Sequence, residues 1–226
     1  MTNNDKRELI HFLTNYVTDA RLSKMNDVLS KRTRYLTLVI EDIYQAQNAS
    51  AVLRSCECFG VQDVHIIENR NTYQVNPDVA LGADKWLSIH KYNKAEHNTL
   101  DCLNELKSKG YKLIATTPHE DDCLLEELPL DQKTALLFGT ELKGLSEEAI
   151  GMADGFMKIS MSGFTESFNI SVSAAICLYH LAPRIRKEVN NWQLTEEEQT
   201  DIMLEWLMGS IKNAQALLKH HINVKR

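Results

Sequence analysis

The 226-residue chain lacks long apolar runs and has little proline or glycine, and these shortages narrow the classes of protein it can be. No stretch reaches the roughly 20 apolar residues of a membrane helix, and the first residues lack the apolar region of a signal peptide. With only four prolines and nine glycines, large disordered segments are not expected. The five cysteines are an odd number without a disulfide-like spacing. We therefore expect a folded cytoplasmic protein with reduced thiols and no membrane span.

Several motifs of common catalytic sites are missing too. The chain has neither a GxGxxG dinucleotide loop nor a GxSxG elbow, and no cluster of His, Cys and carboxylates has the spacing of a metal site. The turn at 139–146 resembles a phosphate loop, but Leu145 stands where the lysine belongs and Glu141 would repel a polyphosphate. This turn suits a ligand that is neutral or positive near Glu141, such as S-adenosylmethionine with its sulfonium.

Charge is distributed unevenly. Residues 1–34 carry seven Lys and Arg against four Asp and Glu, a net +3, whereas residues 35–182 carry eleven against twenty-one, a net −10. Residues 183–226 carry seven against six, a net +1. A partner with phosphates would therefore meet the ends of the chain. Five basic residues of the first segment form either a solvated helix face or a phosphate-binding arm: Arg21, Lys24, Lys31, Arg32 and Arg34.

The middle of the chain alternates between apolar strand-like runs and helical patterns. This alternation predicts an α/β fold with a mostly parallel sheet and helices on both faces. Strands are expected at 35–40, 64–67, 86–89, 112–115, 135–138 and 156–159. Helices are expected at 4–31, 48–59, 98–107, 169–186, 195–207 and 210–221, with another beginning at 146.

Local signals predict where the helices begin and end. We expect Asn48, Ser146, Ser167 and Thr195 to act as N-caps, and Pro183 to end the helix that starts near Asn169. The polar turns after Ala115, Phe138 and Ile159 would lie at the carboxyl ends of strands, where ligands bind in parallel sheets. Asn169 opens an apolar helix and needs polar partners, which makes it a site candidate.

Three segments together resemble a known family. Asn48-x5-Arg54, Phe138-Gly-Thr-Glu-Leu-Lys-Gly-Leu-Ser146 and Ile159-Ser-Met-Ser-Gly-Phe-Thr-Glu-Ser-Phe-Asn-Ile-Ser-Val-Ser173 look like the three ordered motifs of the SPOUT superfamily. Within it, the SpoU (TrmH) family of RNA 2′-O-ribose methyltransferases is most similar, over about residues 36–183. The terminal segments resemble those of the branch that methylates guanosine-18 in the D-loop of tRNA.

The resemblance implies a fold and a set of site residues. It implies a deep trefoil knot in the C-terminal half of the sheet domain, and a homodimer packed through that knot. The expected domains are a basic helical arm at 1–34, the methyltransferase domain at 35–187 and a helical extension at 188–226. S-adenosylmethionine would be bound by Thr116, Thr117, Gly139, Ile159, Ser167 and Phe168. Arg54 would be catalytic, with Asn48, Glu141, Ser167 and Asn169 as its partners, and the five basic residues of the first segment would bind tRNA.

The chemistry leaves the role of Arg54 open. A methyl group on a sulfonium is already activated, so the difficult step is to make a ribose 2′-hydroxyl nucleophilic, and no metal is required. Arg54 either removes the proton, assisted by a phosphate, or binds that phosphate and stabilises the developing negative charge. Two residues depart from the family pattern, namely Gln47, where this branch often has His, and Ser160, where Pro is usual.

Two alternatives to the tRNA reaction stay open at this stage. The first is the same reaction on rRNA or at another tRNA position. The second is a non-catalytic RNA-binding protein on the same fold, against which the presence of Arg54, Glu141, Ser167 and Asn169 argues.

Overall fold

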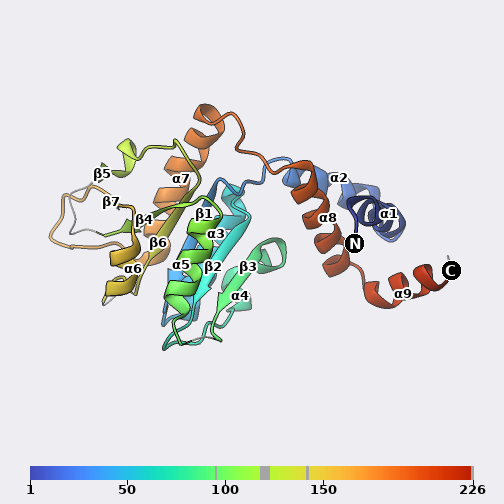
Figure 1. Ribbon diagram of the computed structural model, residues 1–226, viewed down its shortest axis with the longest axis horizontal. Coiled ribbons are helices and arrows are strands. Elements are labelled where there is room, and N and C mark those ends of the chain that lie inside the picture. The colour runs from blue at the N-terminus through green and yellow to red at the C-terminus, as the bar shows by residue number, and fades with distance from the viewer. Residues whose placement is uncertain (95, 118–122, 141–142, 225–226) are drawn as a thin grey trace. The chain divides into compact units, whose positions relative to one another are not determined.

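The protein was analysed as a computed structural model that describes residues 1–94, 96–117, 123–140 and 143–224 (Figure 1). The chain divides into two compact units. One consists of residues 1–32 and 193–226, and the other of the continuous stretch 33–192. Within the described residues, no helix combines the length and apolarity needed to cross a membrane.

In its described residues, the larger unit is built on a seven-stranded sheet whose neighbouring strands all pair in parallel. In spatial order the strands are β3 (Ser88–Tyr92), β2 (Asp63–Ile67), β1 (Leu36–Glu41), β6 (Thr134–Phe138), β4 (Lys112–Thr116), β7 (Gly155–Lys158) and β5 (Cys123–Leu124). The predicted α/β class is thereby confirmed. The two-residue β5 was not expected, and β3 begins two residues later than predicted, because Trp86 belongs to a 3-10 turn, Ala83–Trp86.

Helices cover both faces of this sheet (Figure 1). The helices of the larger unit are α3 (Ala46–Phe59), α4 (Pro77–Ala80), α5 (Asn98–Ser108), α6 (Glu147–Met152) and α7 (Ile170–Glu188). Successive residues of β1 point to opposite faces. Leu38 and Ile40 join the core that contains α3 and α7, whereas Val39 joins the core that contains α5. The near-continuous burial of β1 is typical of a parallel strand covered on both sides.

Two expected helix boundaries differ in the structure. Pro183 lies inside α7 and does not end it. A proline removes one helical hydrogen bond and crowds the carbonyl four residues earlier; here that residue is Tyr179, which is 72% exposed, so its carbonyl can turn towards water. The predicted helix 4–31 is divided into α1 (Asn3–Thr14) and α2 (Asp19–Leu29), because Thr18 caps a new helix by accepting a hydrogen bond from the backbone N–H of Arg21.

The smaller unit brings both ends of the chain together. Besides α1 and α2 it contains α8 (Glu196–Ser210) and α9 (Ala214–Val224). Ion pairs join α1 to α8, one between Lys6 and Asp201 and one between Arg7 and Glu196 at 3.1 Å. The predicted capping box of α8 is present, since Thr195 and Glu198 each accept a hydrogen bond from the other's backbone N–H.

Candidate functional site

A cavity of about 330 Å³ lies where β4, β6 and β7 end. Its volume is within the usual range for small-molecule sites. The six residues expected to bind the cofactor all line it: Thr116, Thr117, Gly139, Ile159, Ser167 and Phe168. Three separate loops therefore meet at one place, because neighbouring parallel strands end at the same edge of a sheet.

One wall of the cavity is a tight glycine turn. Thr140 and Gly144 exchange two backbone hydrogen bonds of 2.9 Å, and Gly144 has a φ of +68°, which glycine adopts without strain. At Gly139 a Cβ atom would lie 2.1 Å from the carbonyl carbon of Gly144. Only glycine fits at position 139, and its bare backbone is left facing the cavity.

A chain of amide hydrogen bonds links two of the expected catalytic residues. Asn169 Nδ2 donates to Asn48 Oδ1 at 3.2 Å, and Asn48 Nδ2 donates to Gln45 Oε1 at 3.2 Å. Asn169 Oδ1 accepts hydrogen bonds from the backbone N–H and the hydroxyl of Ser171, at 2.9 and 2.7 Å. The start of α7 is thus joined to the first turn of α3.

The same geometry corrects two predicted N-caps. α7 is capped by Asn169 and not by Ser167, which leaves Ser167 on the cavity wall. α3 begins after Gln45, so Asn48 lies inside its first turn and is not the cap. The Asn169 side chain accepts the backbone N–H of Ser171, whereas Gln45 makes no capping hydrogen bond and only its extended backbone marks the start of α3.

Arg54 lies apart from the cavity of a single chain. Its side chain is exposed on α3, and it does not line the cavity. Glu141, the remaining member of the expected catalytic group, lies outside the described residues. The structure therefore joins Asn48 to Asn169 and places Ser167 on the wall, and it leaves Arg54 on a free surface of α3.

The five basic residues expected to contact RNA fall into two groups. Arg21, Lys24 and Lys31 are exposed on or just after α2. Arg32 is fully buried, with its guanidinium 5.5 Å from the centre of the Trp206 ring. Arg34 pairs with a carboxylate, since its Nε lies 3.0 Å from Asp63 Oδ2. For Arg32 we therefore correct the expected phosphate contact, because its side chain is buried. Arg34 is half-buried, and its contact with RNA stays a prediction.

Sequence reasoning missed two basic residues on the cavity wall. Lys143 and Lys158 both line the cavity. Lys143 belongs to the glycine turn, with its backbone N–H donating to Thr140 Oγ1 at 3.1 Å, and Lys158 is the last residue of β7. Their positions in a glycine turn and at a strand end were the sequence signal from which they could have been predicted.

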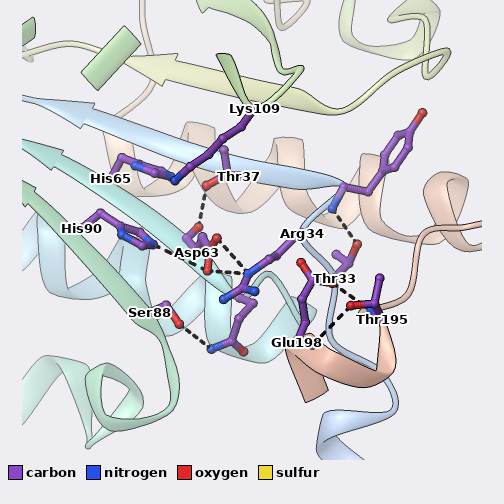
Figure 2. Close-up of polar contacts among 12 residues, drawn as sticks. Thr33, Arg34, Thr37, Asp63, His65, Ser88, His90, Lys109, Thr195 and Glu198 are labelled. Atoms are coloured by element: carbon purple, nitrogen blue, oxygen red, sulfur yellow. Dashed lines mark hydrogen bonds and ion pairs between the residues drawn. The ribbon is translucent and has the colours of Figure 1, made fainter. Parts of the chain in front are cut away.

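One group of potential metal ligands occurs among the described residues, at the opposite edge of the sheet. Asp63, His65 and His90 have ligand atoms within 4.8 Å of one another (Figure 2). Arg34 Nε, however, contacts both carboxylate oxygens of Asp63, at 3.1 and 3.0 Å. The two imidazole rings stack with their centroids 4.6 Å apart and an angle of 14° between them, and His65 Nδ1 is hydrogen-bonded to the Tyr92 hydroxyl at 3.1 Å. We interpret the group as a network of ion pairs and hydrogen bonds.

This network should make folding stability depend on pH. Burial, aided by the charge of His90, lowers the pKa of His65 to about 4 from 6.5. The unfolded chain therefore binds an additional proton between these values, and stability decreases as the pH falls through that window. From pH 7 to pH 5 the wild type should lose about 2 kcal/mol more unfolding free energy than His65→Gln, which keeps a donor for the Tyr92 hydroxyl. Urea unfolding at both pH values measures this difference; equal losses would contradict it.

The carboxylate of Asp63 gives a second pH dependence of stability, outside that window. Burial raises the pKa of Asp63, but the hydrogen bond from His90 and the charge of Arg34 outweigh it and leave that pKa below its usual range. The stabilisation by Asp63 is therefore present above the unfolded pKa of roughly 4 and lost only in stronger acid.

Comparison with known proteins places this geometry in a family. Residues 35–179 match the model of the SpoU rRNA Methylase family. A tRNA (guanosine(18)-2'-O)-methyltransferase of Borreliella burgdorferi is 43% identical over 211 residues, which cover 93% of this chain and 95% of that protein. A protein of the same name from Thermus thermophilus is 32% identical, with 84% and 97% covered.

Solved structures agree with the sequence comparison. The crystal structure of the Aquifex aeolicus TrmH/SpoU tRNA modifying enzyme superimposes with a TM-score of 0.76 and 28% identity, over 86% of this chain and 98% of that one. The SpoU methyltransferase AviRb of Streptomyces viridochromogenes, solved in complex with AdoMet, shares the fold with a TM-score of 0.60 at 21% identity, over 71% of this chain and 64% of that one. The extent of the family match and the identity to the Borreliella protein show that this chain belongs to the SpoU methylase family.

Proposed function

We infer that this protein transfers the methyl group of S-adenosylmethionine to the ribose 2′-hydroxyl of guanosine-18 in tRNA. The observation that carries the inference is the extent of the similarity. Relatives named as methyltransferases of that nucleotide match 93% and 84% of the chain and nearly their own whole length. A 23S rRNA (guanosine-2'-O-)-methyltransferase of Shewanella oneidensis matches only 69% of this chain and 62% of itself.

The cavity at the ends of β4, β6 and β7 is the proposed cofactor site. Its glycine turn offers backbone groups without a side chain at Gly139, and its volume of about 330 Å³ suits a small molecule. Thr116, Thr117, Ile159, Ser167 and Phe168 would complete the walls. Bound there, S-adenosylmethionine supplies a methyl group that is already activated by its sulfonium, so this chain's residues need only orient the ribose and manage the hydroxyl proton.

Arg54 is the proposed catalytic residue. A guanidinium essentially never loses its proton in proteins. We therefore favour a role in which Arg54 binds the phosphate next to the reacting ribose and stabilises the negative charge that develops on its 2′-oxygen. Asn48 and Asn169, joined by their 3.2 Å hydrogen bond, would hold the starts of α3 and α7 together beside it, and Glu141 and Ser167 stay assigned to the same site.

The exposed position of Arg54 supports a homodimer. The start of α7 and its outer surface carry exposed apolar side chains at Phe168, Val172 and Tyr179, with Tyr179 72% exposed. A second copy of the chain would cover this surface and bring its Arg54 to the cavity. Sedimentation analysis should give a dimer for the wild type and a monomer for Tyr179→Asp; a monomeric wild type contradicts this assignment.

We also propose the trefoil knot, which the order of the strands in the sheet supports. β4 lies between β6 and β7 in the sheet, so the chain must pass β4 after β6 before it forms β7. An experimental structure that traces the path through residues 139–169 tests the knot directly.

The smaller unit, with residues 1–32 and 193–226, is the proposed tRNA-binding module. Arg21, Lys24 and Lys31 are exposed on α2 and directly after it, where Lys24 and Lys31 flank Asp27 at 3.8 and 2.6 Å. Replacing all three with Gln should weaken tRNA binding and reduce the dependence of its Kd on salt concentration, since each phosphate contact releases counterions. An unchanged salt dependence would remove these residues from the RNA surface.

Methyl transfer from labelled S-adenosylmethionine tests the function. We expect label in unmodified tRNA at the guanosine-18 ribose, and none in a transcript with adenosine at that position or in rRNA. Label at another nucleotide or in rRNA would keep the reaction and overturn the substrate. RNA binding without transfer to any RNA would favour the non-catalytic alternative.

A further inference from the structure

A buried carboxylate connects the proposed cofactor cavity to the strand that leads to Arg54. Glu41 is the last residue of β1, and its side chain is 3% exposed. Removing a carboxylate from water is costly unless several donors surround it. An apolar residue would serve the core better if stability were the only requirement, so the contacts of Glu41 indicate what its charge is used for.

Three donors converge on Glu41. The backbone N–H of Ser146 donates to Oε2 at 2.8 Å, and the Ser146 hydroxyl donates to Oε1 at 2.8 Å. The hydroxyl of Thr99, in the first turn of α5, donates to Oε1 at 2.6 Å. Ser146 therefore makes two of the three contacts, one from its backbone and one from its side chain.

Ser146 directly follows one wall of the cavity. Its Oγ also caps α6 by accepting the backbone N–H of Ala149 at 3.1 Å. The two residues before it, Gly144 and Leu145, line the cavity. The hydrogen bonds between Thr140 and Gly144 close the turn on itself but do not attach it to the rest of the sheet. The two bonds to Glu41 supply a polar attachment, beside the packing of Leu145 against the core that contains Val39.

The end of β1, which carries Glu41, also leads to the residues proposed for catalysis. Directly after Glu41, Asp42 has a φ of +53° and accepts backbone N–H groups from Asn69 and Arg70 at 2.7 and 2.8 Å, which anchors the end of β1. The chain then enters α3, which carries Asn48 and Arg54. Glu41 thus joins the wall of the cavity to the anchored end of the strand that leads to the catalytic helix.

We propose that Glu41 is a positioning residue that, through Ser146, holds the cavity wall at 143–145 in its cofactor-binding geometry. The proposal rests on the function inferred above. Glu41 contacts neither cofactor nor RNA, and its effect passes through Ser146. Loss of its charge should therefore weaken S-adenosylmethionine binding and leave the chemical step nearly intact once the cofactor is saturating.

The first test uses Glu41→Gln, which keeps the size of the side chain. A glutamine has no charge, and its NH₂ group, placed at the Oε1 position, donates to the Ser146 and Thr99 hydroxyls, which then reverse their roles. The charge-assisted hydrogen bonds to Glu41 thereby become neutral ones, which are about half as strong. We expect the Kd for S-adenosylmethionine, measured by calorimetry, to rise about tenfold, because the bonds that hold Ser146 lose their charge assistance. The KM for the cofactor should rise in parallel, with kcat within about threefold of the wild-type value.

A matched control separates positioning from general stability. Thr99→Val removes the third donor to the same carboxylate and the acceptor of Asn69 Nδ2, at a residue with 0% exposure, but leaves both bonds to Ser146. It should lower Tm and leave the cofactor Kd unchanged. Ser146→Ala, which removes only the hydroxyl bond and the α6 cap, should weaken cofactor binding like Glu41→Gln.

The possible outcomes separate the role of Glu41 from the proposed function. A Glu41→Gln protein whose cofactor Kd is within twofold of wild type overturns the inference, as does an equal loss of affinity in Thr99→Val. If Glu41→Gln does not fold, Ser146→Ala decides between the same two results. A wild type that binds no S-adenosylmethionine contradicts the proposed function itself, whereas a wild type that binds it normally beside an unaffected Glu41→Gln contradicts only the role of Glu41.

Discussion

Replacing Arg54 with alanine is expected to lower the rate of methyl transfer by at least about 100-fold, the usual loss when one charge-stabilising donor is removed from an active site. The Kd for S-adenosylmethionine should stay within about threefold of wild type, because Arg54 does not line the cavity. Single-turnover transfer to tRNA and calorimetry of cofactor binding measure the two effects separately.

Two further variants sharpen the assignment of Arg54. Arg54→Lys keeps the charge but loses the planar fork of donors, so it should recover only part of the rate. Cys58→Ser changes another exposed residue of α3, one turn further on, and should leave transfer unaffected. A rate for Arg54→Ala within a few-fold of wild type would remove this residue from the catalytic group.

Substitution of Gly139 by alanine should weaken cofactor binding by about the same factor as Arg54→Ala slows methyl transfer. A Cβ at this position would meet the backbone of Gly144 at 2.1 Å, a contact that no side-chain rotation relieves. The turn must open, and we expect the affinity for S-adenosylmethionine to fall by at least about 100-fold, roughly 3 kcal/mol. Calorimetric titration of the purified variant measures this loss.

Gly151→Ala is the matched control. Gly151 lies in α6, and a Cβ built there meets nothing within 4 Å. Alanine should stabilise the helix by about 0.5–1 kcal/mol and leave cofactor binding unchanged. If Gly139→Ala binds the cofactor as tightly as Gly151→Ala, the glycine turn is not a wall of the site.

The two inactive variants together test whether the site is shared between subunits. An Arg54→Ala chain still offers an intact cavity, and a Gly139→Ala chain still offers Arg54. If the arginine acts across a dimer interface, co-expressed chains form mixed dimers with one complete site, and a mixture with half its dimers mixed should regain about a quarter of the wild-type activity. If each chain supplies its own arginine, the mixed dimers stay inactive.

Local sequence patterns predicted the elements that depend on neighbours in the chain. The apolar run that includes Leu38 and Ile40 formed the buried strand β1. Ser146 and Thr195 cap helices as expected, since a cap bonds to a backbone group only three residues away. Competition between nearby polar residues was harder to judge, and for this reason Asn169 replaced Ser167 as the cap of α7. The start of α3 at Gln45, which makes no capping hydrogen bond, had no side-chain signal.

The roles of the charged residues could not be predicted from local sequence patterns. Arg32 and Arg34 belong to a basic stretch that indicated phosphate binding, yet one is buried against Trp206 and the other is paired with Asp63. Their partners lie far away in the sequence, and no local pattern specifies them. The same holds for Glu41, which from the sequence was only a polar residue at the end of a strand.

By itself, the sequence determined the α/β class, the three motif segments and, through them, the family. It did so because strand burial, glycine turns and helix caps are properties of short segments. Only the tertiary structure decided that the ends of β4, β6 and β7 form one cavity, that Arg54 stands outside it in a single chain, and that Glu41 supports its wall. The physical reason is distance along the chain: Glu41 and Ser146 are 105 residues apart and meet only because the sheet brings their strand ends together.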